Sequence, residues 1–363
     1  MQYSELTALL EQPVRYDYSR EEIEKIYNLP MTQLMFLAGG IHQKFHDGNK
    51  VQLSNLLSVK TGGCKENCAY CPQSAHYKTD LESHGLLKEE VILDQAQKAK
   101  DIGATRFCMG AAWTSPPEKG PAYERLLTVA EKVKDMGLEV CMTLGMLTDK
   151  QADDLSKSGV DYYNHNLDTS PEYYKKIITT RSYQDRLDTL SRVRKSGMKI
   201  CSGGIVGMGE SLTDRFGLLE QLNALKPHPE SVPINKFVKV DGTPLSEEEE
   251  IDSFHLVRMI ATSRIVLPKS KIRLSAGRMQ MNEQTQAMCF LAGASSIFTG
   301  EKLLTTDNPG IKKDMSLLEK MGLEPECAEQ SLSIEENDSG EVGSKLHPEH
   351  RPPVESYQPS TVH

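Results

Sequence analysis

Short runs rich in β-branched and aromatic residues alternate with helical patterns along most of this 363-residue chain. Eight such runs follow one another from about residue 51: VQLSNLLSV, TRFCMGA, LEVCMTLG, VDYYNHNL, MKICSGGIVG, SVPINKFV, KIRLSAG and SSIFTG. The helical patterns between them cover residues 88–101, 122–136, 149–157, 183–196, 212–225, 247–264 and 283–291. Eight β-α units in about 250 residues predict a closed parallel (β/α)8 barrel of the TIM type rather than an open doubly wound sheet.

The two ends of the chain differ from this alternating region. Residues 1–50 carry amphipathic helical patterns at 4–10, 19–27 and 32–45, and Gly39 and Gly40 are expected to interrupt the third helix. Residues 323–363 are rich in Pro, Ser and Glu and nearly free of large apolar residues, which predicts a disordered tail. The expected organisation is an N-terminal helical cap (1–50), a barrel (51–322) and this tail.

Composition excludes several classes of protein. Lys and Arg number 42 against 51 Asp and Glu, a net charge of −9, and no basic block is present that would follow a nucleic-acid backbone. No apolar run approaches the roughly 18 residues that would predict a membrane-spanning helix. The first residues lack the apolar core of a signal peptide, and most of the eight cysteines are scattered rather than arranged as a disulfide framework. We therefore expect a cytoplasmic protein with no nucleic-acid or membrane partner.

A loop that follows the first predicted strand reads TGGCKENCAYCP, with cysteines at 64, 68 and 71. In a barrel this position lies at the carboxyl-terminal face, where barrel enzymes keep their active sites. A structural zinc site uses four ligands, and an ordinary 4Fe-4S site uses four cysteines. Three thiols would leave one iron of a cluster open to a small molecule. Half of a zinc site completed elsewhere, or plain reduced thiols, remain the alternatives.

Three further cysteines, Cys108, Cys141 and Cys201, fall inside the second, third and fifth predicted strands. A lone strand cysteine is usually a small buried hydrophobic residue. Three of them in separate strands of one barrel could instead face the same interior and hold a second metal centre. Both interpretations stay open on spacing alone.

Polar residues occupy strand positions that Val, Ile or Leu normally fill. Asn164 and Asn166 share one face of the fourth strand, Asn235 lies in the sixth and Arg273 in the seventh. Buried amides and guanidinium groups need hydrogen-bond partners, so they predict either a polar ligand in the barrel mouth or strand ends in water. The glycine-rich run 203–210, GGIVGMGE, would let backbone approach a ligand closely, although many β-α turns also need glycine.

The three-cysteine loop has an aromatic residue, Tyr70, directly before its last cysteine, and this pattern resembles the signature of radical S-adenosylmethionine (SAM) enzymes. Between about residues 53 and 322 the chain also resembles the biotin synthase family within that superfamily. The blocks that carry this resemblance are TGGCKENCAYCPQS, TRFCMGAAW, YYNHNLDTSPE, CSGGIVGMGE, ESVPIN, RLSAGR and NEQTQAMCFLAGA. Residues 109–112, MGAA, replace the Gly-Gly-Glu run of many radical SAM proteins, and this replacement is typical of the biotin synthase family.

The resemblance implies two iron-sulfur clusters and SAM. Cys64, Cys68 and Cys71 would hold a 4Fe-4S cluster whose open iron binds SAM, whereas Cys108, Cys141, Cys201 and Arg273 would hold a 2Fe-2S cluster. Reasoning from residue types alone predicts Cys289 or His165 as the fourth ligand of the second cluster. A guanidinium is a hydrogen-bond donor with no acceptor, which makes Arg273 an unexpected metal ligand.

The resemblance further implies a sulfurtransferase that converts dethiobiotin to biotin. Cleavage of SAM would give a 5′-deoxyadenosyl radical that abstracts hydrogen from the substrate, and the 2Fe-2S cluster would donate the sulfur. Tyr70, Asn166, Asp168, Arg186, Gly203, Ile205 and Gly207 would contact SAM, and Asn164, Asn166, Asn235, Thr305 and Thr306 would contact dethiobiotin. The implied partners are a one-electron donor such as flavodoxin or ferredoxin, the iron-sulfur assembly machinery and a second copy of the chain in a homodimer.

Two other functions remain to be tested. Another radical SAM barrel enzyme, a mutase or maturase that uses only the 4Fe-4S cluster, would have no use for Cys141 and Cys201. A non-catalytic zinc-binding or electron-transfer protein would have no open coordination position for SAM.

Overall fold

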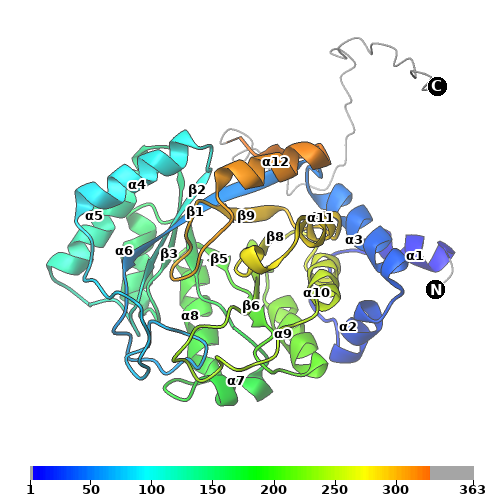
Figure 1. The fold of residues 1–363 in the computed structure, drawn as a ribbon, viewed down its shortest axis with the longest axis horizontal. Coiled ribbons are helices and arrows are strands. Elements are labelled where there is room, and N and C mark those ends of the chain that lie inside the picture. The colour runs from blue at the N-terminus through cyan, green and yellow to red at the C-terminus, as the bar shows by residue number, and fades with distance from the viewer. Residues whose placement is uncertain (1–2, 328–363) are drawn as a thin grey trace, which may run out of the picture.

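A ring of parallel strands forms the centre of the molecule (Figure 1). This computed structural model describes residues 3–327. The strands of the ring are β1 (Lys50–Lys60), β2 (Arg106–Ala111), β3 (Glu139–Thr143), β4 (Tyr162–Asn164), β5 (Lys199–Cys201), β6 (Gly204–Val206), β7 (Ser231–Lys236), β8 (Lys271–Leu274) and β9 (Ser296–Thr299). β1 pairs with β2 on one side and with β9 on the other, so the sheet closes on itself. The predicted (β/α)8 barrel is confirmed.

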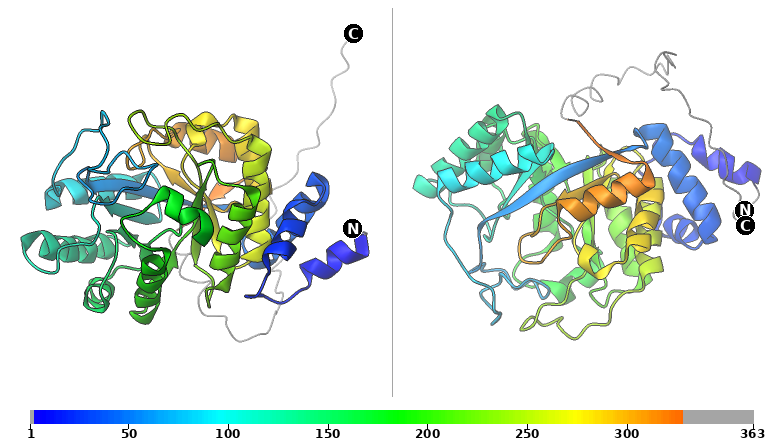
Figure 2. Two further views of the ribbon diagram at one scale, coloured as in Figure 1. Left: turned by 90° about the horizontal axis from the view of Figure 1, so that it is seen from below. Right: turned by 45° about the horizontal axis from the view of Figure 1, so that its top comes forward.

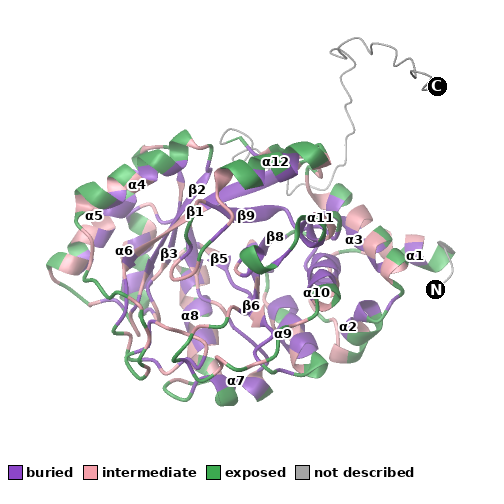
Figure 3. Ribbon diagram, viewed as in Figure 1, coloured by how far each residue is buried: buried purple, intermediate pink, exposed green. Residues whose placement is uncertain are grey.

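Helices surround this ring and turn their apolar faces toward it (Figures 2 and 3). The predicted helical patterns appear as α4 (Glu89–Asp101), α5 (Pro121–Asp135), α6 (Asp149–Lys157), α8 (Tyr183–Lys195), α9 (Leu212–Ala224), α10 (Ser253–Val266) and α11 (Glu283–Leu291). α10 begins six residues later than predicted, because the Asp252 side chain accepts a hydrogen bond from the amide of Phe254 and caps the helix there. Helices α7 (Pro171–Ile177) and α12 (Ile311–Met321) and the 3-10 helix η1 (Arg278–Gln280) were not predicted.

Three helices before β1 pack on the outside of the barrel: α1 (Tyr3–Leu10), α2 (Arg20–Tyr27) and α3 (Met31–Phe45). They lie beside α9 and α10, where Figure 1 draws them in blue. The expected interruption of α3 at Gly39 and Gly40 is wrong, since the helix runs through both. Packing explains one of these glycines, because a Cβ at Gly40 would lie 2.8 Å from a methyl carbon of Leu10.

The fifth predicted strand is divided into β5 and β6 by Ser202 and Gly203. A Cβ at Gly203 would lie only 2.0 Å from the carbonyl oxygen of Pro233, so only glycine fits where the chain passes this close to β7. Both halves still pair with β7, through Cys201 in β5 and through residues 204–206 in β6. The break therefore bends the strand without removing it from the barrel.

The end of the described chain returns to the beginning of the barrel. A two-residue strand, β10 (Glu324–Pro325), pairs with Lys50 and Val51 of β1. The next residue, Glu326, is buried and forms an ion pair with Lys271 of β8. The first few residues of the predicted tail thus close one end of the barrel, and the rest of that tail lies outside the described residues.

Side chains at alternate strand positions face the barrel interior, and most of them are polar. The interior of a typical TIM barrel is filled by layers of branched apolar residues. Here the residues that share the interior face of the strands with Cys108, Cys141 and Cys201 include Gln52, Ser54, Leu56, Arg106, Glu139, Tyr162, Asn164, Lys199, Ser231, Lys271, Arg273, Ser296 and Phe298. Such an interior needs hydrogen-bond partners, and it can supply ligands to a bound polar group.

Candidate active site

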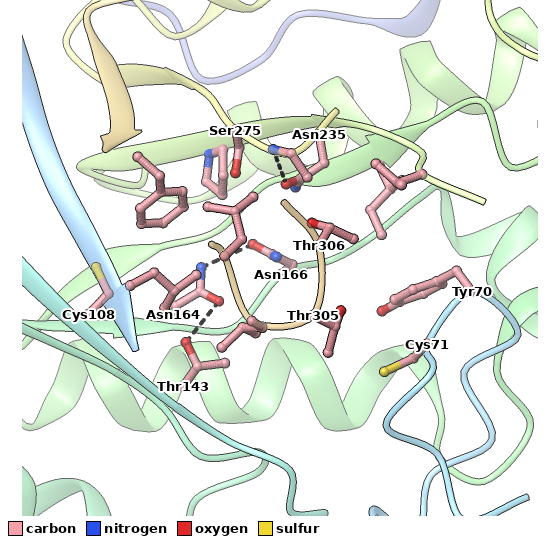
Figure 4. A pocket seen from close by; sticks show the side chains of 18 of the residues that line it. Tyr70, Cys71, Cys108, Thr143, Asn164, Asn166, Asn235, Ser275, Thr305 and Thr306 are labelled. Atoms are coloured by element: carbon pink, nitrogen blue, oxygen red, sulfur yellow. Dashed lines mark hydrogen bonds between the residues drawn. The ribbon is translucent and has the colours of Figure 1, made fainter. Parts of the chain in front are cut away.

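A cavity of about 230 Å³ opens among the loops that follow the carboxyl ends of the strands. Figure 4 shows side chains from the cysteine loop, from strands β2, β3, β4 and β7 and from the loop after β9 gathered around it. Of the residues predicted from the sequence, Tyr70, Cys71, Cys108, Cys141, Asn164, Asn166, Cys201, Ile205, Asn235, Arg273, Thr305 and Thr306 line it. The cavity therefore brings Cys71 of the first set and all three cysteines of the second set to one space, whereas Cys64 and Cys68 do not line it.

The loop with Cys64, Cys68 and Cys71 starts at two glycines whose φ angles are +77° (Gly62) and +68° (Gly63), values that glycine adopts without strain. Two backbone hydrogen bonds then fold the loop back on itself. The amide of Cys71 donates to the carbonyl of Cys68 (2.9 Å), and the amide of Ala75 donates to the carbonyl of Cys64 (2.7 Å). This geometry holds the three cysteines in one compact loop.

The surroundings of this loop oppose free thiolates. Burial raises the pKa of Cys71 to about 12, and the neighbouring Cys68 adds to this shift. Burial also raises the pKa of Cys64 and of Cys68. Metal ligation requires the deprotonated sulfur, so the loop needs a positive centre such as iron to stabilise three thiolates together.

Cys108, Cys141 and Cys201 form the second set. Cys108 pairs directly with Cys141 across β2 and β3, and all three side chains are at most 2% exposed. Cys141 lies within hydrogen-bonding reach of both other thiols. The amide nitrogen of Asn164 donates to the sulfur of Cys201 at 3.2 Å. The prediction that strand cysteines from separate elements face one interior is thereby supported by their positions.

Two buried arginines, Arg106 and Arg273, bring positive charge to this second set. A hydrogen bond from Cys141 lowers the pKa of Cys201 to about 5 against the effect of burial, and the charges of Arg273 and Arg106 act in the same direction. The pKa of Cys108 is also lowered, since the Cys141 hydrogen bond and the two arginines outweigh its burial. The pKa of Cys141 is raised instead, because hydrogen bonds to Cys108 and Cys201 keep its proton in place. The surroundings thus favour anionic sulfur at Cys108 and Cys201, and a metal centre would be needed to hold all three as thiolates.

Arg273 is held at the cavity by three neighbours. Its Nε donates to Ser296 (2.9 Å), and its Nη2 donates to Ser54 (2.9 Å) and to Gln52 (3.3 Å). Nη1 makes no hydrogen bond with any residue between 3 and 327, and the side chain lines the cavity. One terminal nitrogen is thus left for whatever the cavity contains.

The alternative fourth ligands do not reach the cavity. Cys289 is buried in the apolar core beneath α11. His165 points to the opposite strand face from Asn164 and Asn166 and stacks near Tyr163, with ring centroids 6.4 Å apart. The sequence-based preference for these two residues over Arg273 is therefore not supported by their positions.

A cluster suits these donors better than a single ion does. Within residues 3–327, no three His, Cys, Asp or Glu side chains are close enough together to hold one metal ion. A zinc ion requires all of its thiolates at about 2.3 Å. In a 4Fe-4S cluster each thiolate binds its own iron, and in a 2Fe-2S cluster four ligands are shared between two irons, so the donors can stand further apart than around one ion. The residues present fit the two clusters that the sequence implies.

Beside the cysteine loop, Asp168 connects Tyr70 and Arg186. Its Oδ2 accepts a hydrogen bond from the Tyr70 hydroxyl (2.8 Å) and forms a close ion pair with Arg186 Nη2. Arg186 also donates from Nε to the hydroxyl of Tyr174 (2.8 Å) and from Nη1 to the carbonyl of Asn166. Asp168 and Arg186 do not line the cavity itself, and Tyr70 lies between them and it.

Three asparagines lie on the cavity wall. Asn164 accepts from Thr143 (3.2 Å) and donates to Asn166 (3.2 Å), and Figure 4 shows these contacts as dashed lines. Asn235 bridges β6 and the loop after β8, since it donates to the Gly204 carbonyl (3.0 Å) and accepts from the amide of Ala276 (3.1 Å). These side chains are fixed in orientation before any ligand binds.

The glycine-rich run contributes unequally. The amide of Gly203 donates to the side chain of Asn166 at 3.1 Å, and Ile205 lines the cavity. Gly207 lies away from it, where its amide donates to the carboxylate of Glu210 at 2.9 Å. The positive φ of +98° at Gly207 points to a role in the turn rather than in a cavity contact.

Several lining residues were missed from the sequence because they are apolar and resemble ordinary core residues. They include Leu56, Phe237, Val240, Phe298, Leu303 and Leu304, together with the polar Thr143 and Ser275. Thr143 and Ser275 could have been found from the sequence. Thr143 lies two residues after Cys141 and Ser275 two residues after Arg273, so the alternation of a strand directs each toward the same side as its predicted ligand. The lining accordingly combines polar and apolar side chains. Between residues 3 and 327, no helix combines the length and apolar character needed to cross a bilayer.

Solved structures with this fold include methylornithine synthase (PylB), with a TM-score of 0.75 and 18% identity over 91% of this chain and 99% of the other. The hydrogenase maturase HydG also has a TM-score of 0.75, with 15% identity over 91% of this chain and 78% of the other. At these identities the similarity concerns the fold alone.

Sequence comparison is more specific. The family model described as Radical SAM superfamily matches residues 58–222, and the Biotin and Thiamin Synthesis associated domain matches residues 233–324. The biotin synthase of Photobacterium profundum is 60% identical over 85% of this chain and 88% of its own length. That of Cellvibrio japonicus is 57% identical over 91% of both chains. The chain therefore belongs to the biotin synthase family of the radical SAM superfamily.

Proposed function

We propose that this chain is a biotin synthase, a sulfurtransferase that converts dethiobiotin to biotin with SAM as the source of the radical. Membership of the family supports the reaction, and the site supports it separately. The observation that carries the proposal is the second set of cysteines, because Cys108, Cys141 and Cys201 surround the same cavity as Cys71 and Arg273. A radical SAM enzyme with a single cluster has no need of them.

We assign Cys64, Cys68 and Cys71 to a 4Fe-4S cluster, and Cys108, Cys141, Cys201 and Arg273 to a 2Fe-2S cluster. When bound, these groups supply the electron that cleaves SAM to methionine and a 5′-deoxyadenosyl radical, and the sulfur that enters the substrate. The chain's own contribution is to provide the thiolates, to fix their separation and to keep water from the reacting atoms. The near-complete burial of the second set of cysteines serves this last purpose.

The SAM site is assigned to Tyr70, Asn166, Asp168, Arg186, Gly203 and Ile205, with Gly207 shaping the turn after Ile205 rather than lining the cavity. The Arg186 guanidinium can bind a carboxylate through two parallel N–H groups, and the Asp168 carboxylate can accept from ribose hydroxyls. In the structure these two side chains bind each other. SAM would therefore exchange an internal ion pair for contacts of the same kind, so neither buried charge is left unpaired.

The dethiobiotin site is assigned to Asn164, Asn166, Asn235, Thr305 and Thr306. The asparagine amides lie beside the strand cysteines and can bind the ureido group of the substrate, which both donates and accepts hydrogen bonds. The apolar side chains of the lining suit the alkyl chain, and the two threonines lie on a loop that can reach the carboxylate.

The test is a comparison of two cysteine variants after anaerobic reconstitution with iron and sulfide. We expect Cys201→Ala to lose the 2Fe-2S absorbance and all biotin formation, while it still cleaves SAM to 5′-deoxyadenosine. Cys289→Ala is the matched control, since that cysteine is equally buried but belongs to the apolar core. A wild-type chain that cleaves SAM but forms no biotin, with the same SAM cleavage in Cys201→Ala, would instead favour a mutase or maturase that uses only the 4Fe-4S cluster.

The surrounding partners follow from this chemistry. The proposed reaction needs a one-electron donor such as flavodoxin or ferredoxin, and iron-sulfur assembly machinery to supply the clusters. We further propose a homodimer in the cytoplasm, with residues 1–50 as a helical cap, residues 51–322 as the catalytic barrel and residues 323–363 as a tail. Packing of α3 against α10 and the closed sheet support the first two boundaries.

A further inference from the structure

Arg106, the first residue of β2, is completely buried and has one anionic partner. Its Nε donates to Oε2 of Glu139 at 2.9 Å, and its Nη2 lies 2.8 Å from the same oxygen. The ring of Tyr162 lies against the guanidinium, 3.4 Å from Cζ to the ring centroid. A strong positive charge is thus fixed within the barrel by two neighbouring strands.

Two nitrogens of this guanidinium remain without a well-formed hydrogen bond. Neither Nη1 nor Nη2 has a hydrogen-bond partner among residues 3–327, although Nη2 takes part in the ion pair with Glu139. A buried N–H group without an acceptor costs about 1–3 kcal/mol, and more in a charged group. Arg264, which is equally buried, bonds through Nε, Nη1 and Nη2 to carbonyls and side chains. The contrast indicates that Arg106 lacks an acceptor that the functional molecule provides.

The position of Arg106 identifies that acceptor. It lies two residues before Cys108 on the same strand face, and Ser54, Arg106 and Glu139 are direct neighbours across β1, β2 and β3. Two residues further along the same three strands, Leu56, Cys108 and Cys141 are again direct neighbours. The side chains of Cys108 and Cys141 therefore follow Arg106 and Glu139 directly on the same interior face of the barrel.

We propose that Arg106 is a positioning residue of the second metal site, which gives hydrogen bonds and a fixed positive charge to the sulfur atoms held by Cys108, Cys141 and Cys201. Glu139 fixes its orientation and offsets part of its charge. The inference rests on the proposed function, because it requires a 2Fe-2S cluster at these cysteines. It adds a residue that is not a metal ligand and has no role in the contacts assigned above.

The proposal has a consequence with a defined sign. Charge and hydrogen bonds at the sulfurs set the reduction potential of an iron-sulfur cluster. Removal of the positive charge by Arg106→Met should lower the potential, since the reduced cluster carries one more negative charge. Removal of the opposing carboxylate by Glu139→Gln should raise the potential. If Arg106 and Glu139 were needed only for folding, the reduction potential would shift in the same direction in both variants, or in neither.

The experiment measures the midpoint potential of the 2Fe-2S cluster in the full-length reconstituted chain by a redox titration followed by absorbance. Arg106→Lys, which keeps the charge but loses the planar donor group, is included in case the methionine variant does not fold. Arg194→Gln is the control, because Arg194 lies on the outer helix α8, and its hydrogen bonds within residues 3–327 go to Glu230, Pro227 and His228 rather than to a cysteine. Loss of the cluster to an iron chelator should also be about 10- to 100-fold faster in Arg106→Met.

We expect opposite shifts for Arg106→Met and Glu139→Gln, a smaller fall in potential for Arg106→Lys and no shift for Arg194→Gln. Shifts of the same sign, or no shift while the cluster is present, would overturn the inference and leave the proposed function intact. A wild-type chain that binds no second cluster under these conditions would overturn both.

Discussion

At the scale of single residues, Asp168 has a backbone conformation that its surroundings must enforce. Among residues 3–327 it is the one non-glycine residue with a positive φ, +68°. Such a conformation costs of order 1–3 kcal/mol in most residues and tends to occur at functional sites. The amides of Leu167 and Asp168 both donate to the carbonyl of Gly203, which holds the turn in place. The carboxylate is thereby presented to Tyr70 and Arg186.

The substitution Asp168→Asn tests the SAM site. Asparagine tolerates the same φ, so the turn should persist, but the ion pair with Arg186 is lost. We expect the SAM concentration for half-saturation to rise about 10- to 100-fold, which corresponds to about 1.4–2.8 kcal/mol. Equilibrium binding of SAM to the reconstituted chain measures it. Asp188→Asn on α8 is the control, and equal affinities in all three proteins would rule out the assignment of Asp168.

A second prediction at this scale concerns His42 and acid stability. Burial and, to a smaller extent, the charge of Arg264 together lower the pKa of His42 to about 4. The folded chain therefore keeps His42 neutral, while the unfolded chain takes up a proton below about pH 6.5. The stability associated with this group is complete above pH 6.5 and is lost as the pH falls toward 4. Between pH 7 and pH 5 the loss should be about 1–2 kcal/mol.

His42→Phe should remove this part of the pH dependence, because phenylalanine can stay stacked near His46 without titrating. Urea unfolding at pH 7 and at pH 5 measures the difference. His84→Gln, at an exposed histidine, should behave like the wild type. If His42→Phe loses as much stability as the wild type over this range, the burial of His42 does not cause the effect.

At the scale of elements, the loop between β9 and α12 joins the substrate site to the frame of the barrel. It is bounded by Gly300 and Gly310, with φ angles of +106° and +83°. Asn308 holds its base, since its amide donates to the carbonyls of Phe298 (2.9 Å) and Gly300 (2.8 Å). At its tip, Leu304 packs so closely on β2 that a Cβ at Gly110 would lie 2.5 Å from it. The loop is therefore held at its base by Asn308 and at its tip by Leu304.

Asn308→Ala should loosen the base of this loop and weaken dethiobiotin binding. The part-buried Gly300 carbonyl would lose the Asn308 hydrogen bond, and the Phe298 carbonyl would keep only that from Arg278. A cost of about 1–3 kcal/mol would raise the KM for dethiobiotin roughly 5- to 100-fold. Affinity for SAM should not change, because the loop carries none of the residues assigned to SAM. Glu301→Ala, an exposed position on the same loop, serves as the control. Parallel losses of SAM and dethiobiotin affinity in Asn308→Ala would contradict this separation.

Local patterns predicted most elements but not those that depend on tertiary contacts. The helical patterns at 149–157 and 283–291 match α6 and α11 residue for residue. The break at Gly203 could not be predicted, because it depends on the distance to the Pro233 carbonyl in another strand. Likewise, the glycines of α3 predict a break when read locally, whereas in the structure Gly40 makes room for Leu10. Contacts distant in sequence decided both cases.

At the scale of the whole molecule, the barrel exchanges an apolar interior for a polar one around its cysteines. The alternation of strands and helices predicted the closed barrel, and the spacing of Cys64, Cys68 and Cys71 marked the loop to which we assign the first cluster. Residue types could not predict Arg273, since a guanidinium is an improbable ligand and only the family resemblance singled it out. The role inferred for Arg106 was also beyond the sequence, because it depends on an absent hydrogen-bond partner among the described residues.

The central claim is that sulfur held by Cys108, Cys141 and Cys201 enters the product. The most direct test reconstitutes the chain with 34S-sulfide, removes free sulfide, and incubates it without oxygen with dethiobiotin, SAM and a reductant. Mass spectrometry then measures the isotope in the product. The account predicts biotin with 34S, in an amount no greater than the 2Fe-2S clusters loaded, together with 5′-deoxyadenosine. Unlabelled biotin from clusters that retain their 34S, or 5′-deoxyadenosine without biotin while both clusters are present, would contradict it.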